Sequence, residues 1–154
     1  MEEKIIANTS SLIFLGKLNI FYLAKNMFSQ ILIPFEVSEE LFAHEKPESN
    51  IIKKELGNFI KEIKIEKITN FNIHKGEKAA LSLCLQKGLP FLSDDKKARK
   101  LAVSLGIECT GVIGILSWNK ENKKINVEEY NNLLKKLIDN GYYITTDLYD
   151  KLKK

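Results

Sequence analysis

The sequence predicts a single α/β domain in which a parallel sheet of about five strands is covered by helices on both faces. Short apolar runs alternate with longer amphipathic stretches along most of the chain, which is the order of repeated strand–helix–strand units. The length of 154 residues suits one domain. A content of 44% hydrophobic and 29% charged residues suits a buried core rather than disorder.

The predicted strands are short and apolar. They cover residues 4–8, 30–33, 63–68, 89–92 and 107–110. Pro34 stops the second strand because its ring cannot donate to the sheet. Lysine and glutamate alternate with the isoleucines of the third strand, so we expect that strand at an edge of the sheet.

Apolar residues at helical spacing predict the helices between and after these strands. The helices cover residues 12–15, 19–26, 35–44, 50–62, 76–87, a stretch that begins after Asp95, 111–119, 127–140 and 147–152. Gly16 is expected to interrupt the first helical region, and Gly88 to end the helix before it. Ser93 or Asp94 is expected to cap the helix that follows the fourth strand. The last two helices form a C-terminal extension over about residues 126–154.

Composition limits the classes of protein and compartment. The net charge of +4 permits a polyanionic partner without requiring one. Cys84 and Cys109 form no close pair in sequence, so we expect buried, reduced thiols rather than a structural zinc site. No apolar stretch approaches the roughly 20 residues of a membrane span, and the acidic start does not resemble a signal peptide. We therefore expect a cytoplasmic protein without a membrane partner.

Polar residues follow the ends of several predicted strands. Asn8 ends the first strand, and Asp94 ends the fourth. Glu40 lies in the helix after the second strand, and Glu77 lies in the first turn of a later helix. In open α/β folds, ligands bind at the edge formed by the carboxyl ends of the strands. Oxygen ligands suit Mg²⁺ or Mn²⁺, although each residue is also explained as a turn residue, a helix-dipole partner or a solvated acid.

Five short motifs follow one another along the chain. They are Ile-Ile-Ala-Asn-Thr-Ser-Ser-Leu-Ile at 5–13, Pro34 with Val-Ser-Glu-Glu-Leu at 37–41, Gly-Glu-Lys-Ala-Ala at 76–80, Leu-Ser-Asp-Asp at 92–95 with Ala98-Arg99, and Thr-Gly-Val-Ile-Gly at 110–114. In this order they resemble the motifs of PIN-domain proteins, in particular the small prokaryotic branch related to VapC toxins. Each motif is weak alone, but the five together are fairly specific and the resemblance covers residues 4–152.

The resemblance implies a three-layer α/β/α fold and metal-dependent endoribonuclease activity. By matching motifs, it implies Asn8, Glu40, Glu77 and Asp94 as metal ligands, with Asp95 as a neighbouring candidate. The implied catalytic acids are Glu40, Glu77 and Asp94. In the implied reaction, a metal-activated water attacks the RNA phosphorus and the ion stabilises the developing charge. The resemblance further implies an antitoxin protein as a partner and a homodimer.

Residue 8 departs from the typical pattern, in which active members of the family carry an aspartate. Asn8 can bind a hard cation through its amide oxygen, but it adds no charge. At about 4 Å and an effective dielectric near 20, one charge pair contributes roughly 4 kcal/mol before desolvation. We therefore expect weaker metal binding, for which Asp95 is the candidate to compensate.

Basic residues follow the paired acids. Lys96 and Arg99 are candidates to hold RNA phosphates, and Ser10 matches a polar residue near the family's site. A solvated helix face is the alternative explanation of the two cations. A PIN-like module that binds RNA or a protein without cleavage is the alternative function. A receiver or hydrolase domain is disfavoured because it requires paired acids after the first strand, whereas these follow the fourth.

Overall fold

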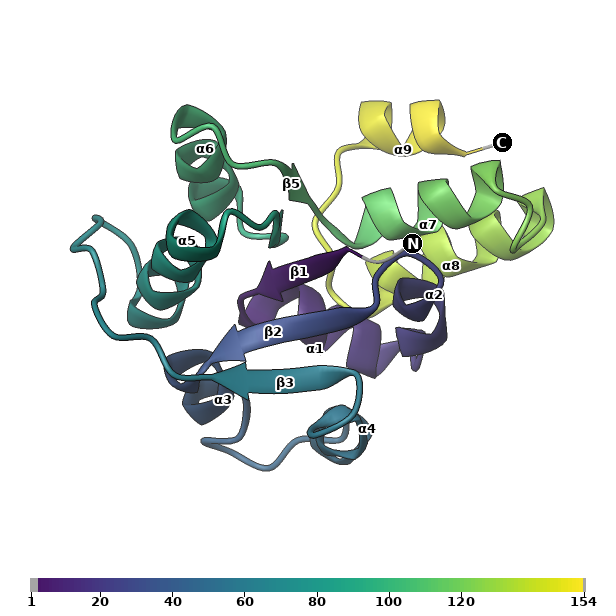
Figure 1. The fold of residues 1–154 in the computed structure, drawn as a ribbon. Helices are drawn as coiled ribbons and strands as arrows, with labels where there is room; N and C mark the ends of the chain where they lie inside the picture. Colours follow the sequence, from purple (N-terminus) through teal and green to yellow (C-terminus); the bar gives the residue numbers. More distant parts are fainter. Residues whose placement is uncertain (1–2, 154) are drawn as a thin grey trace.

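The computed structural model describes residues 3–153, which contain a five-stranded sheet enclosed by helices (Figure 1). The strands are β1 (Lys4–Ala7), β2 (Gln30–Pro34), β3 (Ile60–Ile63), β4 (Phe91–Leu92) and β5 (Cys109–Thr110). Their order is β3-β2-β1-β4-β5, and every neighbouring pair is parallel. The predicted fold class is confirmed, and β3 lies at an edge as its alternating charges indicated.

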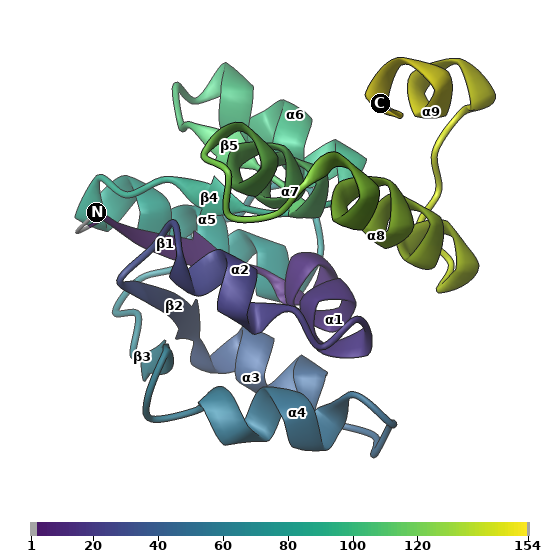
Figure 2. The same cartoon turned by 90° about the vertical axis from the view of Figure 1, so that its right-hand side faces the viewer.

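Helices cover both faces of the sheet. In the described residues they are α1 (Thr9–Lys17), α2 (Phe21–Lys25), α3 (Phe35–Leu41), α4 (Ser49–Glu55), α5 (Lys75–Lys87), α6 (Lys96–Ser104), α7 (Val112–Glu121), α8 (Val127–Asp139) and α9 (Thr146–Leu152). The crossover from β1 to β2 and the crossover from β3 to β4 run in opposite directions across the sheet. Because such crossovers are right-handed, α1 and α5 cover opposite faces (Figure 2). None of these helices is long and apolar enough to cross a membrane.

The two central strands carry the core. Ile5 and Ile6 of β1 and Ile31 and Ile33 of β2 are almost completely inaccessible to solvent. Ile5 pairs with Ile31 in the parallel register. Near-continuous apolar runs of this kind are typical of strands buried on both faces. The carboxyl end of β1, the middle strand of the sheet, therefore has a rigid base.

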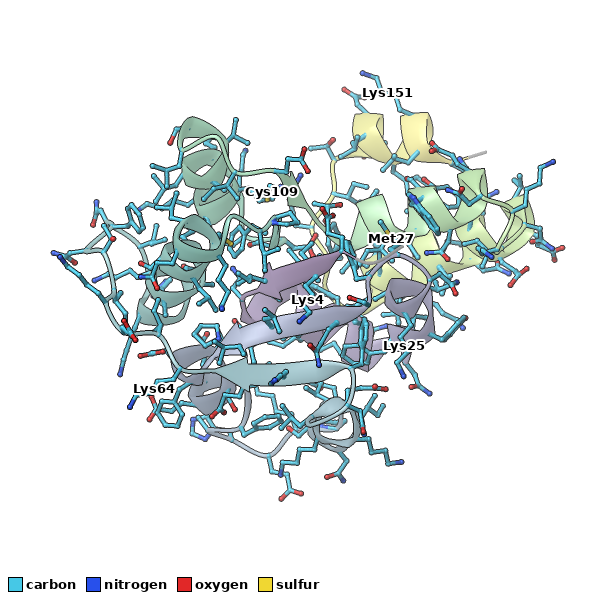
Figure 3. The ribbon with its side chains drawn as sticks, in the orientation of Figure 1. Lys4, Lys25, Met27, Lys64, Cys109 and Lys151 are labelled. Atoms are coloured by element: carbon cyan, nitrogen blue, oxygen red, sulfur yellow. The ribbon has the colours of Figure 1, made fainter. Side chains whose placement is uncertain are left out.

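The third strand begins earlier than the sequence predicts. The helix predicted over 50–62 ends at Glu55, and β3 spans Ile60–Ile63 instead of 63–68. Gly57 turns the chain with φ of +84°, a conformation that favours glycine, so the helix cannot continue. Ile60 then pairs with Ile31, and Lys64 lies just past the carboxyl end of β3 (Figure 3).

Two further expectations change. Gly16 does not interrupt α1 but lies inside it, where a Cβ atom would stand 3.0 Å from Ile52 Cγ1. The glycine therefore allows α1 and α4 to approach closely.

Cys84 and Cys109 are both free thiols, and burial raises the pKa of Cys84 to about 12. The expectation of reduced cysteines agrees with this, although Cys109 is only partly buried.

Candidate functional site

The candidate site lies where the winding direction of the sheet reverses, at the carboxyl ends of β1 and β4. In open α/β sheets this switch point is where ligands bind. Asn8 follows β1 and Ser93 follows β4, and Asn8 Nδ2 donates a hydrogen bond of 2.8 Å to Ser93 Oγ. Asn8 is 1% exposed, so its amide is buried where the ends of the two strands meet.

Two serine hydroxyls hold the turn after β4 against residue 8. Ser10 Oγ donates to Asn8 Oδ1 at 2.9 Å and accepts from the backbone nitrogen of Asp94 at 2.9 Å. Ser93 Oγ accepts from the backbone nitrogen of Asp95 at 3.1 Å. The positions of both aspartates therefore depend on this serine–amide network. The expected contact between Ser10 and RNA stays a prediction.

Asp94 is surrounded by hydrogen-bond donors from three distant segments. Its carboxylate accepts from Ser11 Oγ at 2.5 Å, from the Val112 backbone nitrogen at 3.1 and 3.2 Å, and from the Tyr142 hydroxyl at 2.7 Å. Burial and the neighbouring Asp94 charge raise the pKa of Tyr142, so its hydroxyl stays protonated and donates. Asp94 thereby ties α1, α7 and the C-terminal segment to the end of β4.

Asp95 lines a different cavity from the one that Asp94 lines. Its Oδ2 accepts from the Ala98 backbone nitrogen at 2.8 Å, so Asp95 is the N-cap of α6 rather than either of the two residues predicted for that role. With Glu77 it lines a cavity of about 270 Å³. Adjacent acids thus serve opposite sides of one turn.

Glu77 is the carboxyl group whose environment is most unfavourable for charge. It is 9% exposed. Burial, followed by the Asp95 carboxylate, raises its pKa; His74 opposes this, and Glu40 adds a smaller increase. Since two other acids help to raise this pKa, the electrostatic field at Glu77 is one that a bound cation would relieve.

Glu40 reaches the same region from α3. Its Oε1 accepts from Thr9 Oγ1 at 3.2 Å. Its Oε2 lies against Gly76, the residue before Glu77, and a Cβ atom there would stand 2.8 Å from that oxygen. The glycine therefore leaves room for the Glu40 carboxylate at the first turn of α5.

We name Glu40, Glu77 and Asp95 the acidic cluster. No group of three histidine, cysteine, aspartate or glutamate side chains within residues 3–153 already has the geometry to hold a metal ion. The donor chemistry nevertheless fits Mg²⁺ or Mn²⁺, because these carboxylates offer only oxygen and because Asp95 and Glu40 both raise the pKa of Glu77. Asp94 fits less well, because several donors already occupy its oxygens.

Some contacts at the site could not be foreseen. Tyr142 lies 48 positions from Asp94 in sequence, and no local pattern indicates that they bond. The position of Glu36 near the site could have been predicted from the sequence, because Glu36 precedes Glu40 by one helical turn and shares its face of α3. Its Oε1 is buried and has no hydrogen-bond partner among the described residues.

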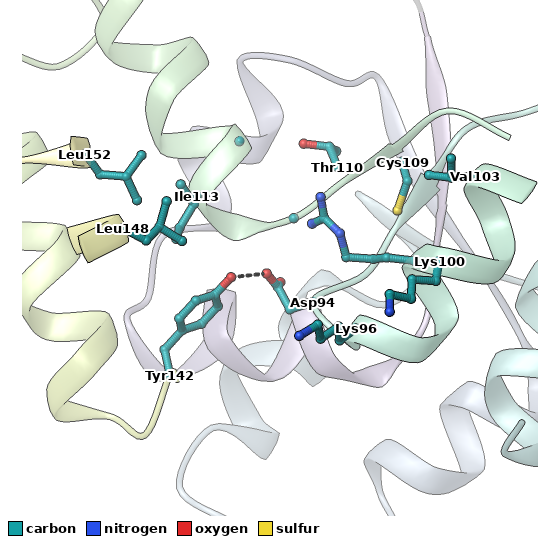
Figure 4. Close-up of a pocket in the computed structure, with 13 residues that line it drawn as sticks. Asp94, Lys96, Lys100, Val103, Cys109, Thr110, Ile113, Tyr142, Leu148 and Leu152 are labelled. Atoms are coloured by element: carbon teal, nitrogen blue, oxygen red, sulfur yellow. Dashed lines mark hydrogen bonds between the residues drawn. The ribbon is translucent and has the colours of Figure 1, made fainter. Parts of the chain in front are cut away.

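The predicted cations of α6 lie on the other side of the turn. Arg99 Nη1 donates to the Ser93 carbonyl oxygen at 3.2 Å. Lys96 and Arg99 line a cavity of about 660 Å³ beside Asp94 and Tyr142, shown in Figure 4. The structure therefore brings the two cations to one cavity, and their binding of RNA phosphates stays a prediction.

Comparisons with known proteins found one matching family model and a similar solved structure. The family model DUF3368, described as a PIN domain, matches residues 4–154. A PilT N-terminus domain protein from the hyperthermophilic archaeon Sulfolobus solfataricus P2 is similar in structure, with a TM-score of 0.49 and 13% identity, covering 74% of this chain and 91% of that one. No curated protein matches the chain. Because the family model spans almost the whole chain, this protein belongs to the DUF3368 family of PIN domains.

Proposed function

We propose that this protein is a PIN-type endoribonuclease that hydrolyses RNA phosphodiesters with the help of Mg²⁺ or Mn²⁺. The observation that carries the proposal is the acidic cluster at the switch point of a PIN fold. Glu40 and Glu77 are the predicted catalytic acids that belong to it, and Asp95 supplies the third carboxylate. The hydrogen bonds of Asp94 support a structural role for that residue, so we propose Asp95, the neighbouring candidate, as the third ligand. Metal binding by Asp94 stays a prediction.

In this proposal, some residues of the site bind the ion and others bind the substrate. Glu40, Glu77 and Asp95 would hold the cation, and the predicted ligand Asn8 is joined through Ser93 and Ser10 to the turn that carries Asp95. A bound cation supplies a more acidic water and stabilises charge on the phosphate oxygens. Thr9 orients Glu40 through its hydroxyl, while the Ala98 nitrogen orients Asp95. Lys96 and Arg99 would bind phosphates next to the reacting one.

A binding module without cleavage is the second candidate, and Asn8 is the observation that favours it. The Asn8 amide is buried, and its nitrogen and oxygen each form a hydrogen bond with a serine, so the amide has hydrogen-bond partners without a cation. A toxin role, an antitoxin partner and a homodimer follow from the family resemblance and stay predictions. A small antitoxin-like reading frame beside this gene, and a dimer mass in light scattering, are the corresponding checks.

RNA cleavage with added Mn²⁺ separates the two candidates. We expect the wild type to cleave RNA, and Glu77→Gln and Asp95→Asn each to lower the rate by about 100-fold or more, because each removes a charge from the cation site. Glu108→Gln is the matched control, since this exposed acid precedes β5 at the opposite edge of the sheet. Absence of both cleavage and calorimetric Mn²⁺ binding in the wild type would overturn the enzyme proposal.

A further inference from the structure

The cavity of about 660 Å³ beside Asp94 has a basic wall and an apolar wall. Lys96, Arg99 and Lys100 of α6 form the basic wall. Figure 4 shows Ile113 of α7 with Leu148 and Leu152 of α9 on the opposite side. The proposed cleavage chemistry uses the cations only as general phosphate contacts and assigns no role to the apolar wall.

Two of the three apolar residues of this wall, Leu148 and Leu152, come from α9. None of the α9 residues is buried, and Leu148 is 44% exposed. Leu148 and Leu152 are four residues apart and therefore share one face of the helix, and both line the cavity. Leu148 is exposed and Leu152 is partly buried against the core, so this face of α9 presents apolar surface to the cavity.

The basic wall has the spacing of one helix face. Lys96, Arg99 and Lys100 occupy positions i, i+3 and i+4 of α6. The hydrogen bond from Arg99 to the Ser93 carbonyl fixes the guanidinium beside the end of β4. Asp94 is the acid that lines this cavity, and its single negative charge stands against the positive charges of Lys96, Arg99 and Lys100, so the cavity carries a net positive charge.

We propose that this cavity is a nucleotide subsite for single-stranded RNA, with phosphates on the α6 cations and a base against Ile113, Leu148 and Leu152. A polynucleotide carries an anion and a flat apolar group in every repeat, which matches the two walls. The volume lies within the range of pockets that bind small ligands. The subsite rests on the proposed function in one respect: the Asp94–Asp95 turn joins it to the acidic cluster, so a bound strand continues from one to the other.

Binding in the absence of metal tests the subsite without cleavage. The probe is a short fluorescein-labelled single-stranded RNA in EDTA, measured by fluorescence anisotropy, with an abasic version of the same strand. We expect Lys100→Glu to weaken binding by about tenfold and to lower the salt slope by about 1. Leu148→Gln should weaken binding of the base-bearing strand by about fivefold and leave the abasic strand unchanged. The matched control is Lys54→Glu, the same charge change on exposed α4.

The outcomes distinguish this proposal from the proposed function. Equal affinity of Lys100→Glu and Lys54→Glu would overturn the subsite even if the wild type cleaves RNA. Loss of affinity in Lys100→Glu with none in Leu148→Gln would show only a cationic surface and would also overturn it. Failure of the wild type to bind RNA would overturn it and leave an acidic apolar peptide as the occupant. Wild-type binding with both selective losses, but no cleavage in Mn²⁺, would support the subsite and reject the nuclease.

Discussion

Asp94 and Asp95 are neighbours in sequence but differ in what their carboxylates meet. Asp94 accepts hydrogen bonds from Ser11, Val112 and Tyr142. Asp95 caps α6 with one oxygen and contributes to the raised pKa of Glu77. The first acid is surrounded by donors that come from other elements, whereas the second shares a cavity with Glu77, His74 and Lys97 and repels the Glu77 carboxylate. The hydrogen bonds of Asp94 indicate a role in stability, whereas the repulsion between Asp95 and Glu77 indicates a role in binding a cation.

Alanine substitutions provide the strongest test of this difference. Asp94→Ala leaves three donor groups without their acceptor and should lower the free energy of unfolding by about 3 kcal/mol. Asp95→Ala should cost about 1 kcal/mol or less, because it removes one helix cap and also relieves repulsion with Glu77. Urea unfolding measures both, and equal losses would contradict the division of roles.

The same comparison can be sharpened with conservative substitutions. The sequence predicts that Asp94→Asn abolishes cleavage. The contacts around the two residues instead lead us to expect the larger loss of Mn²⁺ affinity in Asp95→Asn. Calorimetry on the two folded variants, checked by circular dichroism, ranks them directly.

Asn8→Asp should have opposite effects with and without metal. The new carboxylate is buried and loses the bond from Nδ2 to Ser93 Oγ, so the metal-free protein should lose about 2 kcal/mol of stability. With Mn²⁺ present, the added charge should tighten metal binding and raise the melting temperature more than in the wild type. An unchanged affinity would mean that residue 8 does not bind the metal.

Two glycines test the carboxylates without changing them. A Cβ atom at Gly111 would meet the Asp94 carboxylate and Arg99 Nη1, and Asp94 is a short side chain held by several donors. Gly111→Ala should therefore cost about 1–2 kcal/mol. Gly76→Ala would displace only the end of the flexible Glu40 side chain, so Mn²⁺ affinity should fall with little change in stability. Thermal melts with and without Mn²⁺ distinguish the two results.

The same pair of acids shows how far the sequence could lead. The order of strands and helices, the edge position of β3 and the gathering of polar residues near the ends of β1 and β4 all follow from periodicity and parallel topology. Which of two adjacent acids caps α6 depends on backbone geometry after β4 that no residue pattern specifies. Tyr142 reaches Asp94 only because α8 folds back on α7, a long-range contact without a local signal.

Glu77→Gln should have the smallest effect on stability among these variants, with a distinctive pH dependence. Burial and the Asp95 charge raise the pKa of Glu77 in the folded protein above its ordinary value near 4.5. In the pH range between these two values the folded state binds more protons than the unfolded state, so wild-type stability falls as the pH rises through it. Glu77→Gln removes this loss, so the variant should be more stable than the wild type at pH 7, and by a smaller margin below pH 4.5. Added Mn²⁺ should stabilise the wild type and Glu108→Gln but not Glu77→Gln. A stability difference between variant and wild type that is independent of pH would show that the Glu77 charge does not oppose folding. It would also contradict the inference that the environment of this carboxylate favours binding of a cation.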